Sequence, residues 1–319
     1  MVLSLFLGRY EISFMEALGI FSKLFSGDLS DKDFSTYNVL FNVRLPRIIL
    51  VVLVGSSLAL SGAIFQAIFR NPLVSPDILG VSSGASFGAV LGLLLKSGSM
   101  LWVQALSFVF GVLAVSVAYL ISKAGRFNRV LMLILSGIIV SSFFHALVSI
   151  IKYIADPYNE LPAMVFWSMG GFFRVSWTDF FITGPVIIVG IMTIIMLRWK
   201  LNMISLGDDE AITLGIDIKL LRKIFIFLAT LIVASGISIC GTIGWVGLIV
   251  PHIARIIIGP NHGKMILLTG ILGAIFLLVT DDLARSLTTA EIPIGILTSL
   301  IGAPFFCYIM LTKRKSGWA

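Results

Sequence analysis

Charged residues are scarce in this sequence. Asp, Glu, Lys and Arg make up 12% of the 319 residues, and 58% are hydrophobic. A typical soluble domain carries about 25% charged residues. The hydrophobic residues stand in long runs, without the short alternating segments of a membrane β-barrel. Only helices and closed barrels satisfy their backbone hydrogen bonds in lipid. The composition therefore predicts a bundle of membrane-spanning helices.

Cysteine and histidine are rare as well, with two and three residues. Cys240 and Cys307 lie inside apolar runs and are expected to be small buried hydrophobic residues. They form neither a zinc-binding pattern nor a disulfide framework. We therefore expect no resident metal and no cofactor.

Sequence motifs for hydrolysis are missing. The string closest to a nucleotide-binding loop, Gly259 to Lys264, has the wrong spacing and no hydroxyl residue to hold Mg²⁺. Neither a His-Glu-x-x-His motif nor a nucleophile elbow is present. These absences argue against an intramembrane hydrolase and against ATP hydrolysis by this chain.

Nine apolar runs are predicted to be membrane spans. A helix needs about 20 apolar residues to cross the hydrocarbon core. The run 161–173 is too short to span and is predicted to be a re-entrant or interfacial segment that protein buries. The nine spans are placed near residues 47–69, 77–95, 101–121, 128–154, 178–197, 221–240, 244–258, 265–286 and 293–311.

The start of the chain is unusual for such a protein. Only seven residues precede Gly8, too few for a span. They could belong to a signal peptide, but they carry neither a charged start nor a small-residue cleavage site. We prefer the interpretation that they are the tail of a first helix whose beginning is missing. Residues 12–25 are modestly amphipathic and are expected at a membrane interface.

Lysine and arginine predict the orientation. Of the 23, 14 fall on one side of the predicted spans and nine on the other. The richer side should be cytoplasmic, because cytoplasmic loops carry the excess of positive charge. The nine assigned to the outer side are Arg9, Lys23, Lys32, Arg44, Arg47, Lys96, Lys152, Arg174 and Arg285.

Polar, Pro-rich and Gly-rich motifs interrupt the apolar runs. They are Arg44-Leu-Pro-Arg47, the hinge 70–85 (Arg-Asn-Pro-Leu-Val-Ser-Pro-Asp-Ile-Leu-Gly-Val-Ser-Ser-Gly-Ala), the insert 206–215, the stretch 241–255 ending in Gly-Leu-Ile-Val-Pro-His-Ile-Ala-Arg, and the later 281–285 and 290–295. Together they resemble the FecCD family of binding-protein-dependent permeases, which import ferric siderophores, haem and vitamin B12. The resemblance runs in register from about Leu5 to Leu311.

The resemblance implies an all-α, polytopic transmembrane bundle like that of the vitamin B12 permease, with residues 1–319 as one permease domain. Family members have ten spans, whereas we count nine. The implied partners are two ABC ATPase subunits, a periplasmic or lipid-anchored binding protein and a second permease copy, with the translocation path between the two copies. The implied location is the bacterial or archaeal cytoplasmic (inner) membrane.

The polar segment 201–219 lies on the predicted cytoplasmic side. Its acidic residues follow Gly207 within one turn, where the start of a short helix would favour negative charge. The family places its coupling helices here, and the alternative is a solvated loop helix. The resemblance assigns ATPase coupling to Gly207, Asp208, Asp209, Glu210, Ala211, Leu214 and Gly215.

Three arginines lie on the predicted outer side. Arg44 and Arg47 are three residues apart at a helix start, and Arg285 ends another span. In the resembled vitamin B12 permease, matching arginines meet acidic residues of the binding protein, so binding-protein docking is implied here. Exposed charge pairs of this kind mainly steer docking. The alternative is that they extend toward lipid headgroups.

Some residues inside the spans could serve either transport or packing. Ser141 and His145 lie on a helix that borders the translocation path in the family, and His145 could instead be a packing histidine. Asp281 and Asp282 are costly in a span, yet both could simply pair with Arg285. Small residues that allow close helix packing are Gly55, Gly62, Gly80, Gly84 and Gly88.

We therefore predict the permease subunit of an ABC importer for an iron chelate, either a ferric siderophore or ferric citrate. The alternatives are haem, vitamin B12 or molybdate as the cargo. A self-sufficient secondary transporter is the rival from another class. It should carry ionisable relays or broken helices near the middle of the membrane, and charge within the predicted spans is nearly absent.

Overall fold

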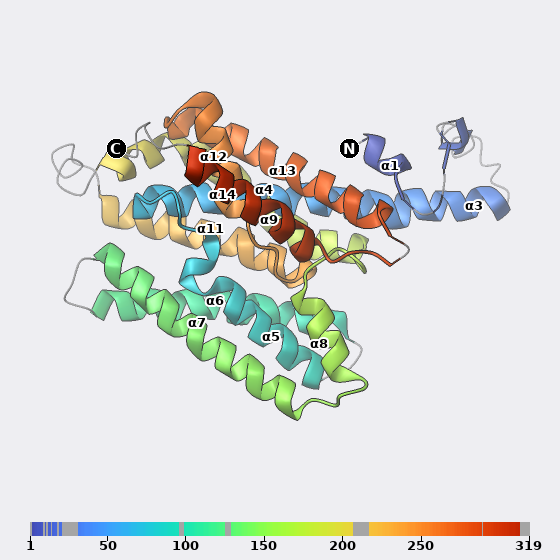
Figure 1. The fold of residues 1–319 in the computed structure, drawn as a ribbon, viewed down its shortest axis with the longest axis horizontal. Coiled ribbons are helices and arrows are strands. Elements are labelled where there is room, and N and C mark those ends of the chain that lie inside the picture. The colour runs from blue at the N-terminus through green and yellow to red at the C-terminus, as the bar shows by residue number, and fades with distance from the viewer. Residues whose placement is uncertain are drawn as a thin grey trace.

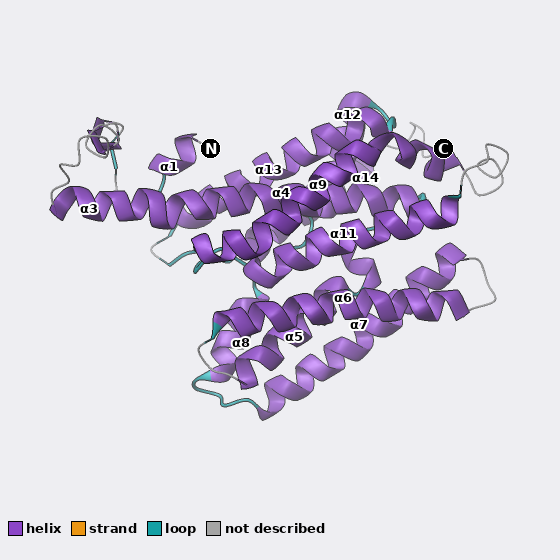
Figure 2. Cartoon of the chain, turned by 180° about the vertical axis from the view of Figure 1, so that it is seen from behind, coloured by secondary structure: helices purple, strands orange, loops and turns teal. Residues whose placement is uncertain are grey.

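The computed structural model describes residues 2–8, 10, 12, 13, 15–17, 19, 20, 31–95, 99–124, 129–206, 217–288 and 290–312. All regular elements in these ranges are helices, so the predicted all-helical bundle is confirmed (Figures 1 and 2). The chain is therefore built from elements whose backbones satisfy their own hydrogen bonds, as a lipid environment demands.

Nine helices coincide with the nine predicted spans. Six stretches are long and apolar enough to cross a membrane, and three apolar helices are shorter. The first long stretch is continuous through α3 (Asp31–Tyr37), the π-helical turn η1 (Asn38–Arg44) and α4 (Leu45–Phe69). The other long helices are α6 (Met100–Ala124), α7 (Arg129–Ile154), α9 (Trp177–Leu206), α11 (Ile218–Cys240) and α13 (His262–Ser286), and the shorter ones are α5 (Val81–Leu95), α12 (Val246–Ile258) and α14 (Ile294–Thr312).

Several helix boundaries differ from the sequence prediction: the first helical stretch begins at Asp31 instead of near residue 47, and two later boundaries also shift. Helix α5 begins at Val81 rather than at residue 77, because Pro76–Leu79 form the 3-10 turn η2 and Gly80 follows at φ +83°. Helix α9 continues to Leu206 instead of ending near 197. The segment predicted as a polar coupling loop, 201–219, therefore begins inside α9 and ends inside α11.

The short apolar run predicted over 161–173 contains α8 (Glu160–Ser168), a helix of nine residues. It is too short to cross a membrane, as expected, at about 1.5 Å of rise per residue. The chain start forms α1 (Val2–Phe6). Much of the predicted interfacial stretch 12–25, including all of 21–25, lies outside the described residues.

Helices α4 and α11 form the centre of the bundle, and most of their residues are buried. Helix α13 crosses α4 where two glycines meet. A β-carbon on Gly273 would lie 2.4 Å from the Gly55 carbonyl oxygen, and one on Gly62 only 1.8 Å from that of Gly247 on α12. Gly84 and Gly88 make equally close contacts with α6. Packing, the structural interpretation of these glycines, is therefore confirmed.

The helices form two groups that lie side by side. Figures 1 and 2 show α5, α6, α7 and α8 together on one side, and α4, α9 and α11–α14 on the other. The groups are joined where α6 and α5 pack on α11. This arrangement leaves a boundary along which polar residues from both groups can face a common space.

Candidate functional site

Three stretches of non-helical backbone meet between the two groups: the end of α8, the break between α11 and α12, and the start of α14. The Gly171 N–H donates to the Cys240 carbonyl (2.7 Å), and the Ile294 N–H donates to the Gly170 carbonyl (2.9 Å). Gly170 and Gly241 have φ values of +71° and +68°. Irregular backbone in a membrane protein is tolerated only where protein buries it or where it lines a cavity.

These three backbone segments can approach closely because the residues at their contacts, Gly241 and Gly295, are glycines. A β-carbon on Gly241 would lie 2.2 Å from the Trp167 carbonyl oxygen, and one on Gly295 would lie 2.3 Å from that of Met169. The Thr242 hydroxyl adds a cross-link by donating to the Ser168 carbonyl at 2.6 Å. The junction is therefore a fixed structural element, held by hydrogen bonds between three segments distant in sequence.

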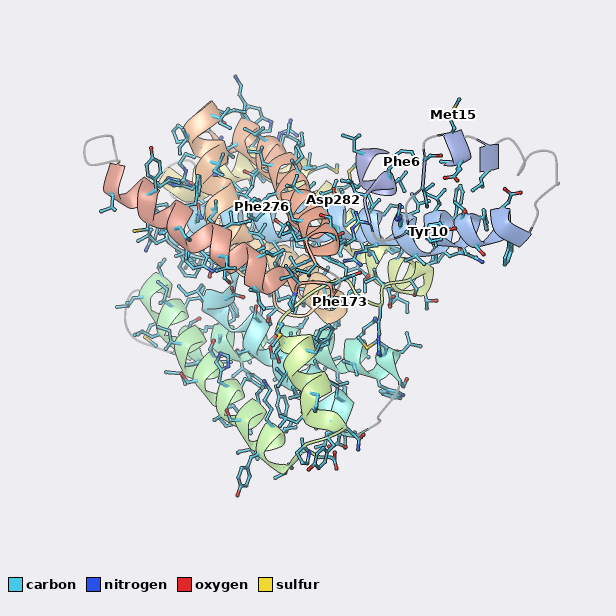
Figure 3. The ribbon with its side chains drawn as sticks, turned by 45° about the vertical axis from the view of Figure 1, so that its right-hand side comes forward. Phe6, Tyr10, Met15, Phe173, Phe276 and Asp282 are labelled. Carbon is cyan, nitrogen blue, oxygen red and sulfur yellow. The ribbon has the colours of Figure 1, made fainter. Side chains whose placement is uncertain are left out.

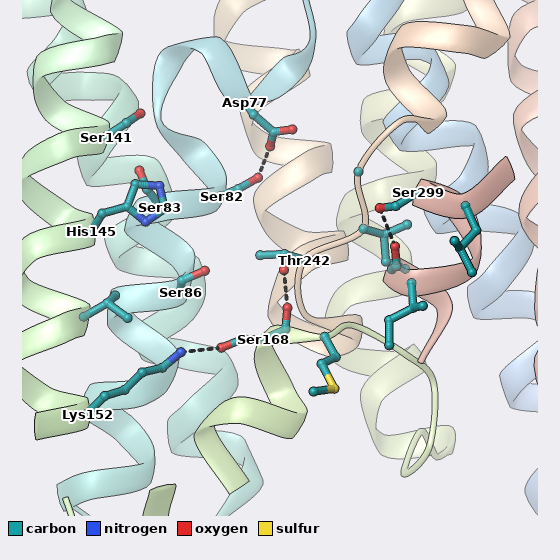
Figure 4. A pocket seen from close by; sticks show the side chains of 17 residues that line it. Asp77, Ser82, Ser83, Ser86, Ser141, His145, Lys152, Ser168, Thr242 and Ser299 are labelled. Carbon is teal, nitrogen blue, oxygen red and sulfur yellow. Dashed lines mark hydrogen bonds between the residues drawn. The ribbon is translucent and has the colours of Figure 1, made fainter. Parts of the chain in front are cut away.

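A cavity of about 750 Å³ opens beside this junction (Figure 4). One wall is built by η2, α5 and α7, and the opposite wall by the α11–α12 break and α14. Hydroxyl side chains dominate its polar lining, and they are Ser82, Ser83, Ser86, Ser141, Ser168, Thr242 and Ser299.

Helix α7 contributes one face to the cavity. Ser141, His145, Val148 and Lys152 line it, at helical spacings of four, three and four residues. Residues at these spacings lie above one another on the same side of a helix. Lys152 donates from Nζ to the Ser168 Oγ at 3.3 Å, which links α7 to α8.

The opposite end of the cavity carries a carboxylate. Asp77, in η2, accepts a hydrogen bond from the Ser82 hydroxyl at the start of α5. Figure 4 shows Asp77 and Lys152 near opposite ends of the cavity, with His145 between them. Because Asp77 is separated from Lys152 along the cavity, the two charges do not form an ion pair.

The structure brings together the two residues that the sequence assigned to the path, Ser141 and His145, on the wall of this cavity. Sequence reasoning missed Asp77, Lys152 and most of the hydroxyls. The spacing of Lys152, seven residues beyond His145 on the same helix, was a usable signal. The contributions of α8, the α11–α12 break and α14 depend on contacts distant in sequence, and nothing in the motifs indicated them.

A second polar cluster lies at the outer end of α4 and α13. Arg47 donates to Asp281 (Nη2 to Oδ1, 2.8 Å) and to Glu291 (Nη2 to Oε2, 2.9 Å). Arg285 pairs with Asp281 (Nε to Oδ2, 3.3 Å) and with Asp282. The structural alternative for the two aspartates, pairing with Arg285, is confirmed. Buried charges need such partners, because each one otherwise loses its hydration without compensation.

Arg44 belongs to the same outer region but binds backbone. Its guanidinium donates to the carbonyls of Leu5 and Tyr10. Arg285 similarly donates to the carbonyls of Ser4 and Leu7, and the Ser4 hydroxyl donates to Asp282 at 2.7 Å. Figure 3 shows Asp282 beside the N-terminal helix that carries Phe6. These contacts attach the first residues of the chain to α4 and α13.

The three outer arginines are therefore not the exposed cations that the sequence suggested. Arg44, Arg47 and Arg285 are only 4–6% exposed, and all three are bound within the chain. Their internal partners account for arginines on the outer side without a second protein. The docking role stays a prediction that these contacts do not test.

The residues predicted to couple to the ATPase, Gly207, Asp208, Asp209, Glu210, Ala211, Leu214 and Gly215, lie outside the described residues. Their flanks are fixed. Ser205, near the end of α9, is 3.0 Å from His262 at the start of α13, and Asn202 accepts from the His262 N–H at 2.8 Å. Asp217 caps α11 by accepting from the Leu220 N–H at 3.0 Å.

Comparison with known proteins now identifies the family. Residues 1–312 match the FecCD transport family. The chain belongs to the FecCD transport family. It is 41% identical over 319 residues to the molybdate import system permease protein of Haemophilus influenzae, covering 99% of this chain and 93% of that protein.

Two further relatives support the same assignment. A Helicobacter pylori protein, named "Probable iron chelatin transport system permease protein", is 38% identical over 276 residues, with 86% of this chain and 83% of that protein covered. A solved structure, described as "An inward-facing conformation of a putative metal-chelate type ABC transporter", is 40% identical. It superimposes with a TM-score of 0.87 over 97% of this chain and 94% of that one.

This FecCD protein is thus a multi-pass membrane permease of an ABC importer and not a catalytic enzyme. Membership implies ATPase and binding-protein partners. The secondary-transporter interpretation is set aside, although the chain does contain broken helices at the α8, α11–α12 and α14 junction. In this permease they belong to a polar cavity rather than to a chain of buried ionisable groups.

Proposed function

We propose that this permease carries an iron chelate, such as a ferric siderophore or ferric citrate. The cavity supports this cargo class by its size, since about 750 Å³ lies within the roughly 300–1,000 Å³ typical of sites for drug-sized ligands. Its hydroxyl lining can exchange hydrogen bonds with an oxygen-rich complex without holding it tightly. The iron chelatin relative, 38% identical, points to the same class.

Molybdate is the second candidate cargo. The observation that favours it is the 41% identity with the molybdate permease over almost the whole chain. The cavity is larger than a four-oxygen anion requires, so molybdate would contact only part of the lining at one time. Haem and vitamin B12 match the cavity wall less well, because its polar side chains are short hydroxyls spread along the cavity.

The experiment that tests the cargo is reconstitution of the permease with its ATPase and binding protein in proteoliposomes. ATP-dependent uptake of ⁵⁵Fe-labelled ferric citrate or siderophore, with no uptake of ⁹⁹Mo-molybdate, is expected. Uptake of molybdate alone would contradict the iron assignment. Calorimetry of the isolated binding protein with the same compounds provides an independent measurement.

We further propose that residues 207–215 receive force from the ATPase subunits. Support comes from the family resemblance and from the described flanks. Helix α9 ends at Leu206 just before this segment, and α11 begins at Ile218 just after it. The end of α9 is tied to the start of α13 through Asn202, Ser205 and His262. A push on the segment would thus reach three helices at once. Replacing Asp209 and Glu210 with Lys should uncouple ATP hydrolysis from uptake, and normal coupled uptake would remove the assignment.

We propose that the binding protein docks over the outer ends of α4 and α13. The family resemblance supports this location, and the Arg47–Asp281–Arg285 cluster would then shape the docking surface. Charge reversal at Arg44 and Arg47 should weaken capture of the binding protein in a pull-down. Thermal unfolding must be measured on the same variants, because both arginines are buried. Weak capture with unchanged unfolding supports direct contact, and unchanged capture removes the assignment.

We also propose that two permease copies enclose the path, with Ser141 and His145 on its wall. His145 is exposed on α7, and so are Ile138, seven residues earlier on the same face of that helix, and Leu300 on α14. A second copy would cover this surface and close the open side of the cavity. Disulfide cross-linking between copies through a cysteine at position 138 tests this arrangement, in a Cys307→Ser background. Cross-linked dimers are expected, and monomers alone would contradict it.

A further inference from the structure

The charges on the cavity wall are unevenly distributed. Among the described residues that line the cavity, the ionisable side chains are Asp77, His145 and Lys152. Asp77 lies near one end, where it accepts from the Ser82 hydroxyl. Lys152 lies near the other end, so a negatively charged solute meets attraction and repulsion at opposite ends (Figure 4).

Lys152 stands at the outer entrance. It precedes the end of α7 at Ile154 by two residues, and the lysine and arginine distribution places that end outside the cytoplasm. At about 1.5 Å of rise per residue, Lys152 lies roughly 10 Å outward of His145 and roughly 16 Å outward of Ser141 along the helix. An ion that enters from the binding protein therefore passes Lys152 before it reaches His145 and Ser141 on the same helix.

The charge of Lys152 is not neutralised within the described residues. The ion pairs there join Arg47 and Arg285 to acidic residues, and none of them includes Lys152. Its polar contact is the neutral Ser168 hydroxyl, at 3.3 Å. The side chain is half-buried, and a charge in such surroundings acts more strongly than one in bulk water. Lysine and arginine inside a span are costly, and they commonly mark a substrate or ion pathway.

We propose that Lys152 determines the charge preference of this permease, admitting anionic cargo at the outer entrance of the cavity. The inference rests on the proposed function, since ferric citrate, many siderophore complexes and molybdate are all anions. The charge of the ammonium group is the active property, and its hydrogen bond to Ser168 serves only to position it. The neutral hydroxyls that follow offer weak contacts, so the anion is attracted inward without being trapped.

The first test measures the electrostatic potential of the cavity without any cargo. In the complete importer, with Cys307 replaced by Ser, a single reactive cysteine is placed on the cavity wall by Ser86→Cys. The remaining Cys240 is buried. Modification rates are compared for two methanethiosulfonate reagents, one bearing a sulfonate and one bearing a trimethylammonium group. The ratio of the two rates reports the local potential.

Lys152→Gln should lower the sulfonate-to-ammonium ratio by about tenfold, the effect of one charge at intermediate distance and effective dielectric constant. Lys152→Arg should keep the ratio because it keeps the charge. Ser168→Ala should also keep it, since only the hydrogen bond is lost. Arg174→Gln is the matched control, because it removes the same charge from an exposed residue on the outer side that does not line this cavity.

Three outcomes would overturn the proposal. An unchanged ratio in Lys152→Gln would show that the lysine charge does not govern the cavity. An equal fall in Ser168→Ala would assign the effect to the hydrogen bond. An equal fall in Arg174→Gln would assign it to general surface charge.

Uptake then separates this proposal from the proposed cargo. With the anion that the binding protein delivers, Lys152→Gln should reduce uptake about tenfold at limiting cargo, and Lys152→Arg should restore most of it. If the wild-type importer instead carries a neutral compound, the cargo assignment fails, while the reagent ratio still decides whether Lys152 sets the potential. If the cargo is anionic and Lys152→Gln transports normally, the role of Lys152 fails alone.

Discussion

Individual residues in this permease show how a charge can be retained inside a membrane bundle. Asp281 is fully buried and holds Arg47 and Arg285 at the same time. Asp282, one residue further, is partly exposed and holds Arg285 and Ser4. Removing one partner of a buried ion pair leaves an uncompensated charge, which costs more than the pair itself contributes.

Asp281→Asn should therefore destabilise the protein by about 3–5 kcal/mol, because two buried guanidinium groups lose their shared carboxylate. The neighbouring Asp282→Asn should cost less, about 1–2 kcal/mol, since it weakens hydrogen bonds to one arginine and one serine. Thermal unfolding of the purified permease in detergent measures both. Equal losses in the two variants would contradict the central role of Asp281.

Among the helices, close approach is decided by where glycines meet. On α13, Gly273 faces the backbone of α4 at Gly55, whereas Gly270 faces only the side chain of Leu60. The two positions lie one helical turn apart on the same helix. Substitutions at Gly273 and Gly270 therefore compare a contact with rigid backbone and a contact with a side chain that can move.

Gly273→Ala should separate α4 from α13 and destabilise the bundle by about 1–3 kcal/mol or more, as overpacking of a close-packed interior does. Its new β-carbon would lie 2.4 Å from a backbone oxygen. Gly270→Ala, whose β-carbon would lie 3.6 Å from the nearest Leu60 atom, should be tolerated. The unfolding temperature of the two variants measures the difference, and tolerance of Gly273→Ala would show that the crossing can widen freely.

The permease supplies a cavity between two helix groups, and its sequence carries no nucleotide-binding motif. A partner can drive the helices of the permease toward one arrangement only by binding that arrangement better than the other, because a ligand shifts an equilibrium by its differential affinity. Energy must therefore come from the ATPase partners.

The permease reconstituted alone should accumulate no cargo under a proton or sodium gradient. Adding the ATPase, the binding protein and ATP should start uptake, and a lysine-to-alanine change in the phosphate-binding loop of the ATPase should stop it. Labelled cargo inside proteoliposomes is the measurement. Gradient-driven uptake without the ATPase would contradict the importer mechanism.

Some of this could be predicted from composition and periodicity alone. Each of the nine predicted spans coincides with a helix, six of them long enough to cross a membrane, because an apolar run in lipid has no stable alternative to a helix. The family followed from contiguous motifs, and the assignment of Ser141 and His145 to the path followed from the resemblance that those motifs carry. Boundaries at Gly80 and Leu206 shifted because local turns and helix extension depend on neighbours that the sequence does not show.

The amino-acid sequence by itself determined the membrane environment, the helices and the family, because these depend on local hydrophobicity and on contiguous motifs. The tertiary structure decided which polar residues meet. Arg47 is buried against Asp281, and Lys152 reaches Ser168 at the mouth of a cavity. Arg47 and Asp281 are 234 residues apart in the sequence, and Lys152 and Ser168 are 16 apart. Whether such residues meet depends on how the helices pack, and a local sequence pattern does not contain that information.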